Sequence, residues 1–333
     1  MKPWTMSAIW RAEAAVGPLS TLSWPRSGGR PLASDQPART CHVRAPAKIN
    51  LGLRVLGKRS DGYHEIDTVF VAIDCYDDLE FEGTDSGGIA LSWRTDDPDF
   101  PTHDLTGDDS NLIVRAVRLV ERERGLTAHL RIGLIKRIPI AAGLGGGSAD
   151  AAATLAACNR LLGLNETART LSNWAAQLGS DVPFFLGPPC ARGRGRGEIL
   201  EPVECSTDWW ALLVCPSMRL SAAEVYGALR LTGDRPFTDT LPRLAGNGFI
   251  AAIGGLHNDL EQVVIGRAPV VQRWRSQLSH AGARCVLVSG SGPTVVGIFD
   301  FAPDPETIGM GLSPGDRMIV ARPVATRSAL IIG

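Results

Sequence analysis

The sequence predicts an α+β protein with two domains. Its 333 residues are enough for two domains of ordinary size. Strand-like and helix-like segments follow one another as far as about residue 200, and the pattern restarts near residue 206 with an apolar strand, a polar turn and a helix. We therefore assign residues 41–205 to a first domain and residues 206–333 to a second.

The composition is typical of a globular protein without a strong charge. Hydrophobic residues make up 44% of the chain, and 34 Lys and Arg residues balance 35 Asp and Glu residues. This balance argues against a nucleic-acid partner. No apolar run approaches the ~20 residues that span a membrane, so we expect no membrane association. The 7 cysteines include no Cys-x-x-Cys pair and are expected to be reduced thiols of a cytoplasmic protein.

Residues 1–40 differ from the rest of the chain because they combine Pro, Ser, Gly and Arg without apolar periodicity. We expect them to form a disordered N-terminal extension. The segment is poor in acidic residues and contains several arginines, which leaves a transit peptide as the alternative. We favour a bacterial cytosol as the location of the protein, with a plastid-type compartment as the alternative.

Alternating apolar residues indicate the first strand, at 43–56, in which Lys48 and Asn50 point to the same side. A turn at 59–62 follows this strand. The other elements expected in the first domain are strands at 66–73, 78–82 and 129–135, a polar loop at 83–110, a helix from the cap Ser110 to Arg124, helices at 148–162 and 166–178, and a basic turn at 190–198. Those expected in the second are a strand near 209–215, helices at 222–231 and from 257, and strands at 286–288 and 294–299.

The glycine-rich run from Gly143 to Asp150 is the most informative segment. It follows a predicted strand and opens into an alanine-rich helix. Glycines let the backbone approach a bulky anion, and a helix N-terminus offers unpaired N–H groups. A Walker A loop is excluded because no lysine precedes Ser148, and a dinucleotide-binding fingerprint is excluded because position 148 is not glycine. The run predicts a nucleotide phosphate site rather than a flexible linker.

Four separated segments carry a family resemblance. They are Pro-Ala-Lys-Ile-Asn-Leu at 46–51, the glycine-rich loop at 139–152, Leu-Gly-Ser-Asp-Val-Pro-Phe-Phe at 178–185 and Ser-Gly-Ser-Gly-Pro at 289–293. Together they resemble the GHMP small-molecule kinases over residues 43–300. The resemblance implies a ribosomal S5-like N-terminal domain, a ferredoxin-like α/β C-terminal domain, and transfer of the ATP γ-phosphate to an alcohol with Mg²⁺ as cofactor.

Two further segments narrow the resemblance, namely Asp-Gly-Tyr-His-Glu at 61–65 and Gly-Arg-Gly-Glu at 195–198. They resemble the branch whose small-molecule substrate is cytidine diphosphate-linked methylerythritol, phosphorylated on its 2-hydroxyl for isoprenoid precursor synthesis. A family member that acts on a homoserine- or mevalonate-like alcohol is the alternative enzyme. A non-catalytic binding protein on the same scaffold is the alternative of a different class, and either a monomer or a homodimer is compatible with the sequence.

The resemblance implies that Asp181 and Lys48 are the catalytic residues. Asp181 would accept or orient the proton of the attacking hydroxyl, and Lys48 would stabilise the charge that develops on the transferred group. From the local sequence alone, Asp181 is equally well explained as a turn or cap residue before Val182 and Pro183. A surface lysine is the corresponding alternative for Lys48.

The resemblance also implies the binding residues. Those for the substrate are Asn50, Tyr63, His64 and Tyr226. Those for ATP are Lys136, Pro139, Gly143, Leu144, Gly145, Gly146, Gly147, Ser148 and Ala149, with Ser148 also a candidate Mg²⁺ ligand. Ala149 replaces a serine that many family members carry. A supporting turn is implied at Ser289, Gly290 and Gly292.

Several of these assignments have simpler alternatives. A core tyrosine is the alternative for Tyr63 and an exposed histidine is the alternative for His64, while Tyr226 is equally compatible with a residue in the core of its helix. For Arg192, Arg194 and Arg196, a solvated turn is favoured over contact with the substrate diphosphate.

Overall fold

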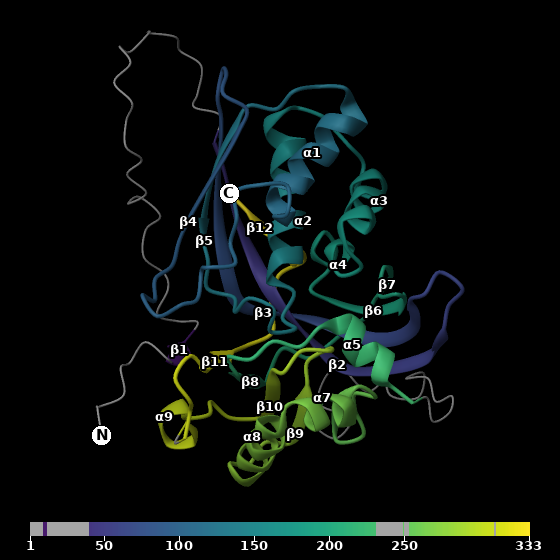
Figure 1. Cartoon of the computed structure of the whole chain (residues 1–333), viewed down its shortest axis with the longest axis vertical. Coiled ribbons are helices and arrows are strands. Elements are labelled where there is room, and N and C mark those ends of the chain that lie inside the picture. The colour runs from purple at the N-terminus through teal and green to yellow at the C-terminus, as the bar shows by residue number, and fades with distance from the viewer. Residues whose placement is uncertain (1–8, 12–39, 231–248, 250–252, 310) are drawn as a thin grey trace.

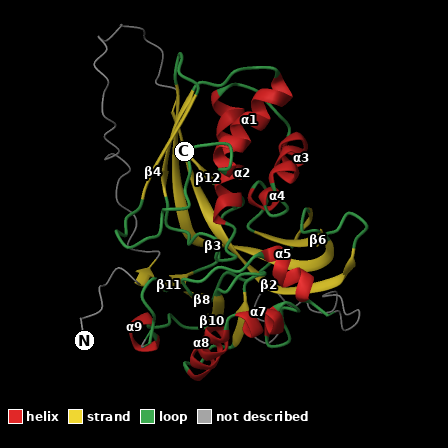
Figure 2. Ribbon diagram, viewed as in Figure 1, coloured by secondary structure: helices red, strands yellow, loops and turns green. Residues whose placement is uncertain are grey.

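The computed structural model describes residues 9–11, 40–230, 249, 253–309 and 311–333. It contains two β-sheets packed face to face, with helices on their outer faces (Figures 1 and 2). The predicted α+β class is confirmed. None of the helices in the described residues is long and apolar enough to cross a membrane.

The first sheet has the strand order β12-β2-β3-β5-β4, and β6 and β7 extend it from β3. Its strands are β2 (Thr40–Lys58), β3 (His64–Gly83), β4 (Ile89–Arg94), β5 (Leu130–Ile135), β6 (Cys190–Gly195), β7 (Ile199–Pro202) and β12 (Ile331–Ile332). The helices on its outer face are α1 (Leu112–Arg124), α2 (Gly146–Leu161), α3 (Ala168–Leu178) and α4 (Val182–Phe185).

The second sheet has the strand order β1-β11-β8-β10-β9. Its strands are β1 (Ile9–Arg11), β8 (Trp210–Cys215), β9 (Cys285–Val288), β10 (Val295–Phe299) and β11 (Arg317–Ala321). The helices among the described residues of this half are α5 (Ala222–Ala228), α7 (Glu261–Arg267), α8 (Pro269–His280) and α9 (Pro305–Ile308). Figure 1 shows α7 and α8 on the side of the second sheet that faces away from the first.

The apolar core lies in three layers, and the middle layer joins the two sheets. Residues of β2 and β3 such as Ile49 and Val71 pack there against residues of the second sheet such as Leu213. The alternation that predicted the first strand therefore buries one side of β2 against the second sheet, while β2 also contributes residues to the other two layers. A functional site on β2 consequently lies where both halves of the molecule meet.

Several predicted elements differ from those observed. The strands expected at 66–73 and 78–82 are one continuous strand, β3, because a bulge opposite the Pro46–Ala47 step carries the chain through the polar residues between them. The polar loop expected at 83–110 contains β4, which pairs in parallel with β5. The basic turn expected at 190–198 begins with β6, whose backbone pairs with β3.

The ends of the helices agree better with the sequence-based predictions than the elements described above. Gly125 and Gly163 have left-handed φ angles of 62° and 61° after α1 and α2, as expected of glycines that end helices. The cap of α1 is Asn111 rather than Ser110, because the Asn111 side chain accepts the hydrogen bond from the Ile113 amide.

A short strand near each end of the chain pairs across the predicted domain boundary. Part of the extension expected to be disordered, Ile9–Arg11, forms β1 and pairs in parallel with β11, while residues 1–8 and 12–39 lie outside the described part. Three residues are too few for apolar periodicity to show. The strand β12 belongs to the first sheet because it pairs with β2, so the expected range 206–333 is not one structural unit.

Lys136, directly after β5, lies in a buried cluster of charges below the glycine-rich loop. Its Nζ is 2.5 Å from Asp77 Oδ2 and 2.7 Å from Asp150 Oδ2. The three side chains are nearly inaccessible to solvent, and Asp77 also accepts hydrogen bonds from the amides of Arg137 and Ile138. Burial raises the pKa of the Asp150 carboxyl well above its usual value; the Lys136 ammonium opposes this rise, and the neighbouring Asp77 adds to it. The ammonium thus joins the turn after β5 to β3 and to the N-terminal part of α2.

We expect Lys136→Met to lower the free energy of unfolding by about 3–5 kcal/mol, because the two buried carboxylates lose their shared cation. Urea unfolding at neutral pH measures this loss. The loss should shrink toward acidic pH, where Asp150 takes up a proton more readily.

The matched control is Arg131→Met, which breaks a partly exposed ion pair with Glu82 on the same sheet. It should cost no more than about 1 kcal/mol. Equal losses in the two variants would contradict the supporting role assigned to Lys136.

Candidate active site

Two adjoining cavities, among those lined by the described residues, meet at the glycine-rich loop. The first has a volume of about 700 Å³ and lies between β2, the start of β3, α5 and the segment that precedes α4. The second, of about 360 Å³, lies between the loop and the start of α1. Gly143 and Gly145 line both cavities. A molecule in one cavity would therefore face a molecule in the other across this short stretch of backbone.

Lys48 and Asn50 lie side by side on β2 at the base of the first cavity, which confirms that they point the same way. Lys48 Nζ donates a 2.8 Å hydrogen bond to Asn50 Oδ1. Asn50 Nδ2 in turn donates to Thr68 Oγ1 at 2.8 Å. Both side chains are buried, so the surface-lysine alternative is wrong. The ammonium is held in one position and aimed at the cavity.

Asp181 lies across the first cavity from β2, immediately before α4. Its Oδ2 is 3.4 Å from Lys48 Nζ, and a third of its side chain is exposed to the cavity. Within the described residues, the carboxylate makes no capping hydrogen bond to α4. The cap alternative is therefore not what the structure shows. The short helix is anchored by the buried side chains of Phe184 and Phe185, which leave the carboxylate facing the lysine.

The glycine-rich loop passes directly beside Lys48. The Lys48 amide donates to the Leu144 carbonyl at 2.8 Å, which joins the loop to β2. Gly145, with a φ of 72°, precedes α2, and a Cβ on it would lie 3.0 Å from Lys48 Cγ. The following residues of α2 present the unpaired N–H groups of a helix N-terminus to the second cavity. The loop therefore has the geometry of an anion site.

The turn between β9 and β10 supports the loop from the second domain. Ser289 Oγ donates to the Gly143 carbonyl at 3.2 Å, and Thr294 Oγ1 donates to the Ala142 carbonyl at 2.6 Å. A Cβ at Gly143 would lie 2.5 Å from the Ser289 carbonyl oxygen, and one at Gly292 would lie 2.6 Å from that of Ala142. Glycine is required at both positions because the two backbones touch.

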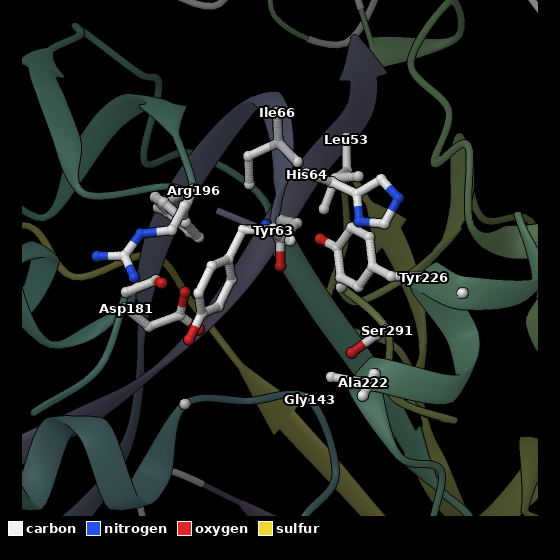
Figure 3. A pocket seen from close by; sticks show the side chains of 18 of the residues that line it. Leu53, Tyr63, His64, Ile66, Gly143, Asp181, Arg196, Ala222, Tyr226 and Ser291 are labelled. Atoms are coloured by element: carbon white, nitrogen blue, oxygen red, sulfur yellow. The ribbon is translucent and has the colours of Figure 1, made fainter. Parts of the chain in front are cut away.

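Aromatic side chains form the far wall of the first cavity. Figure 3 shows its lining residues, among them Tyr63, His64, Asp181, Arg196 and Tyr226. The rings of His64 and Tyr226 stack with 5.2 Å between centroids, and the Arg196 guanidinium lies 4.7 Å from the centre of the Tyr63 ring. Tyr63 is 53% exposed, so it is not a core residue.

The two stacked rings are partly buried. Burial, and to a lesser extent the charge of Lys58, lowers the pKa of His64 below its usual value. Burial also raises the pKa of the Tyr226 hydroxyl. Both rings are therefore uncharged at neutral pH, and the wall they form is suited to a flat, polar ring.

Some residues implied by the resemblance have side chains that are buried or already paired, although Leu144 and Lys136 are among the residues that line the second cavity. Leu144 and Ala149 are buried in the core, so only their backbones are available to a ligand. The Lys136 ammonium is paired with two carboxylates below the loop. Arg192 makes a two-pronged contact with Asp67, and Arg194 lies 3.5 Å from Glu201. Of the three arginines, Arg196 alone lines the first cavity.

Residues of the second cavity that precede α1 were not predicted from the sequence. Thr106, Ser110 and Asn111 lie there, opposite Pro139 and the loop. In the sequence these residues stand out only as polar residues next to the start of a helix. A helix cap is enough to explain polar residues at that position, so they did not indicate a binding site. Nothing local indicates that this loop folds back over the start of α2.

Comparisons with known proteins agree with this geometry. Residues 111–187 match the model of the GHMP kinases N terminal domain. A 4-diphosphocytidyl-2-C-methyl-D-erythritol kinase of Geobacter sp. (strain M21) is 41% identical over 257 residues, which cover 77% of this chain and 88% of the relative. The kinase of the same name from Bacillus cereus (strain B4264) is 40% identical over 259 residues, 77% of this chain and 87% of the relative.

One solved structure gives the same assignment, and a second shares the fold. A crystal structure of 4-(cytidine 5'-diphospho)-2C-methyl-D-erythritol kinase matches with a TM-score of 0.68 at 33% identity, over 86% of this chain and all of that one. A homoserine kinase from Cytophaga hutchinsonii matches with a TM-score of 0.69 at 18% identity, over 91% of this chain and all of that one, which supports the fold alone. The chain therefore belongs to the GHMP kinases, within the family of 4-diphosphocytidyl-2-C-methyl-D-erythritol kinases.

Proposed function

We propose that this protein transfers the γ-phosphate of ATP to the 2-hydroxyl of 4-diphosphocytidyl-2-C-methyl-D-erythritol, a step of the non-mevalonate route to isoprenoid precursors. The observation that carries the proposal is the Lys48–Asp181 pair, which lies in the larger cavity beside the loop shared with the smaller one. The family relationship supports the substrate. The named relatives are bacterial, which supports a cytoplasmic location.

ATP would occupy the second cavity with its phosphates on the loop from Gly143 to Ser148. The amides at the start of α2 and the partial positive charge of the helix N-terminus favour phosphate there. Pro139, Thr106 and Asn111 would then face the rest of the nucleotide. Because Gly143 and Gly145 also line the first cavity, the terminal phosphate would project toward Lys48.

Mg²⁺ fits this site as a companion of ATP rather than as a separately held ion. The described residues contain no cluster of three or more His, Cys, Asp or Glu side chains that would hold a metal. Mg²⁺ in kinase sites needs only one or two protein oxygens beside phosphates and water. The Ser148 hydroxyl, at the start of α2, would supply such an oxygen. The ion would neutralise phosphate charge during transfer.

The chain's own residues position the acceptor and take its proton. The substrate hydroxyl would lie against the Asp181 carboxylate, in line with the γ-phosphorus. Its oxygen attacks phosphorus, the bond to the bridging oxygen of ADP breaks, and the hydroxyl proton passes to Asp181. Lys48, fixed by Asn50, would stabilise the negative charge on the transferred group.

The aromatic wall would select the cytidine part of the substrate. Cytosine is a flat ring with hydrogen-bonding groups, and it would contact Tyr63, Tyr226 and the uncharged imidazole of His64. The Arg196 guanidinium, also in this cavity, is then placed to meet the negative charge of the diphosphate. All residues in this arrangement come from one chain, so we propose that a monomer is competent, and a homodimer is equally compatible.

The proposed reaction is tested with purified protein, Mg-ATP and the cytidyl-erythritol substrate. Phosphorus NMR should show a new phosphomonoester together with ADP. Homoserine and mevalonate serve as alternative acceptors in an ADP-release assay and should give little product. Turnover of either alternative at a rate above that of the cytidyl compound would assign the chain to another reaction of this superfamily.

We expect Asp181→Asn to lower kcat by about 10²–10⁴-fold, because the amide keeps the shape of the side chain but cannot accept the proton. Calorimetry should show nearly unchanged ATP affinity, since the phosphates would bind to the loop. Lys48→Met should also lower kcat, and the double variant should lose less than the product of the single effects.

The control for this series is Asp208→Asn, a fully exposed aspartate outside both cavities. It should leave kcat unchanged. Near-normal turnover by a folded Asp181→Asn variant would remove the catalytic assignment and favour a binding protein.

We expect Tyr226→Ala to weaken binding of the cytidyl substrate by about 1–3 kcal/mol, the range found when a stacking partner of a base is removed. Calorimetry with the substrate and with ATP separates the two sites, and ATP affinity should not change. Tyr226→Phe keeps the ring and should bind the substrate normally. Parallel losses of ATP and substrate affinity would indicate that Tyr226 only supports packing.

A further inference from the structure

Residues His257–Asp259 lie between β2 and the turn that joins β9 to β10. The Leu53 amide donates to the His257 carbonyl, and the Asp259 amide donates to the Leu53 carbonyl, each at 2.9 Å. The Asp259 carboxylate also accepts a 2.8 Å hydrogen bond from the Val55 amide. This three-residue segment is therefore fixed to β2, the strand that carries Lys48 and Asn50.

The side chain of Asn258 links the same segment to the turn between β9 and β10. Its Nδ2 donates to the carbonyls of Val288 at 2.9 Å and Gly290 at 2.6 Å. Its Oδ1 accepts a 2.9 Å hydrogen bond from the Leu260 amide. Asn258 is 4% exposed, and its partners fix the orientation of the amide, because carbonyls require the donor end.

The turn that Asn258 holds contacts both parts of the proposed reaction site. Gly290 has a φ of 58°, and a Cβ there would lie 3.3 Å from Asn50 Oδ1 and 3.6 Å from Lys48 Nζ. On its other side the turn supports the phosphate loop through the hydrogen bond from Ser289 to Gly143. A shift of this turn would therefore alter the space beside the catalytic lysine and the position of the loop together.

We propose that Asn258 is a positioning residue for phosphoryl transfer. By fixing the turn against β2, it holds the Gly143 part of the phosphate loop in place relative to the Lys48 side chain, and in-line attack depends on that geometry. This inference rests on the proposed kinase function. A displacement of about 1 Å at a reacting centre can cost about 10²-fold in rate, so kcat should respond more strongly than binding.

The simpler explanation is that Asn258 only helps to begin α7, since its Oδ1 accepts from the Leu260 amide just before that helix. An aspartate at this position would serve that purpose equally well, because aspartate and asparagine are comparable caps. The substitution Asn258→Asp keeps this acceptor but places a second oxygen against the carbonyls of Val288 and Gly290. It therefore removes the positioning contacts while it preserves the capping contact.

The test compares kcat and KM for ATP and for the cytidyl substrate in Asn258→Asp and in a matched control. The control is Asn159→Asp, whose side chain also accepts from a backbone amide, that of Glu166, but at the end of α2 remote from the turn. We expect kcat to fall about 10-fold to 100-fold in Asn258→Asp, with each KM within about threefold of the original. Asn159→Asp should keep its kcat.

A second readout does not depend on activity. Amide NMR signals of Gly143 and Gly290 should shift in Asn258→Asp and stay in place in Asn159→Asp. If the wild-type protein is inactive but these signals still shift in Asn258→Asp, the proposed function is refuted, while the structural link from Asn258 to the turn and the loop is established. A kcat within about twofold of the original in Asn258→Asp, or signals that do not move, would overturn the positioning role.

Asn258→Ser is the second variant if the buried carboxylate prevents folding. It keeps one hydroxyl donor in a smaller, uncharged side chain, and a smaller loss of kcat with unchanged KM values is expected. Failure of both variants to fold would identify Asn258 as a residue needed for stability and overturn the proposal.

Discussion

The site depends on a contact between two backbones. At Gly143 and Gly292 the glycine-rich loop of the first domain and the β9–β10 turn of the second approach so closely that neither can carry a Cβ. Hydrogen bonds from Ser289 and Thr294 to loop carbonyls hold this contact. The loop is therefore shaped from outside as well as by its own sequence, and its anion-binding geometry requires both domains.

Strand β2 is the second element on which the geometry of the site depends. One face of it is buried in the core between the sheets, and the polar pair Lys48 and Asn50 occupies positions between those apolar residues. The Lys48 backbone binds the loop while its side chain faces Asp181. One residue thus ties the phosphate site to the acceptor site, so a change in the position of β2 would move both together.

Much of this could be predicted from sequence because the signals are local. The alternation in 43–56 gave both the strand and the common direction of Lys48 and Asn50, and the glycine run before an alanine-rich helix indicated the anion loop. The missing parts depend on contacts between distant segments. β4 and β6 are strands because of the neighbours they pair with, and the positions of Lys136 and Asn258 are explained only by residues far along the chain. The catalytic roles were inferred from the family resemblance, because the local sequence around Asp181 is explained equally well by a turn residue.

The segment from 322 to 333 follows the second domain in the chain but closes the first. Its amides at Val324, Ala329 and Gly333 bond to carbonyls of Ala72, Gly187 and His42, and Leu330 is buried in the core under α1–α4. During synthesis the first domain is made well before this segment. The apolar core of the first domain therefore stays partly exposed until the second domain has been made. Folding of the two domains is therefore not strictly sequential, and the newly made N-terminal half is exposed to aggregation for as long as the ribosome needs to make the rest.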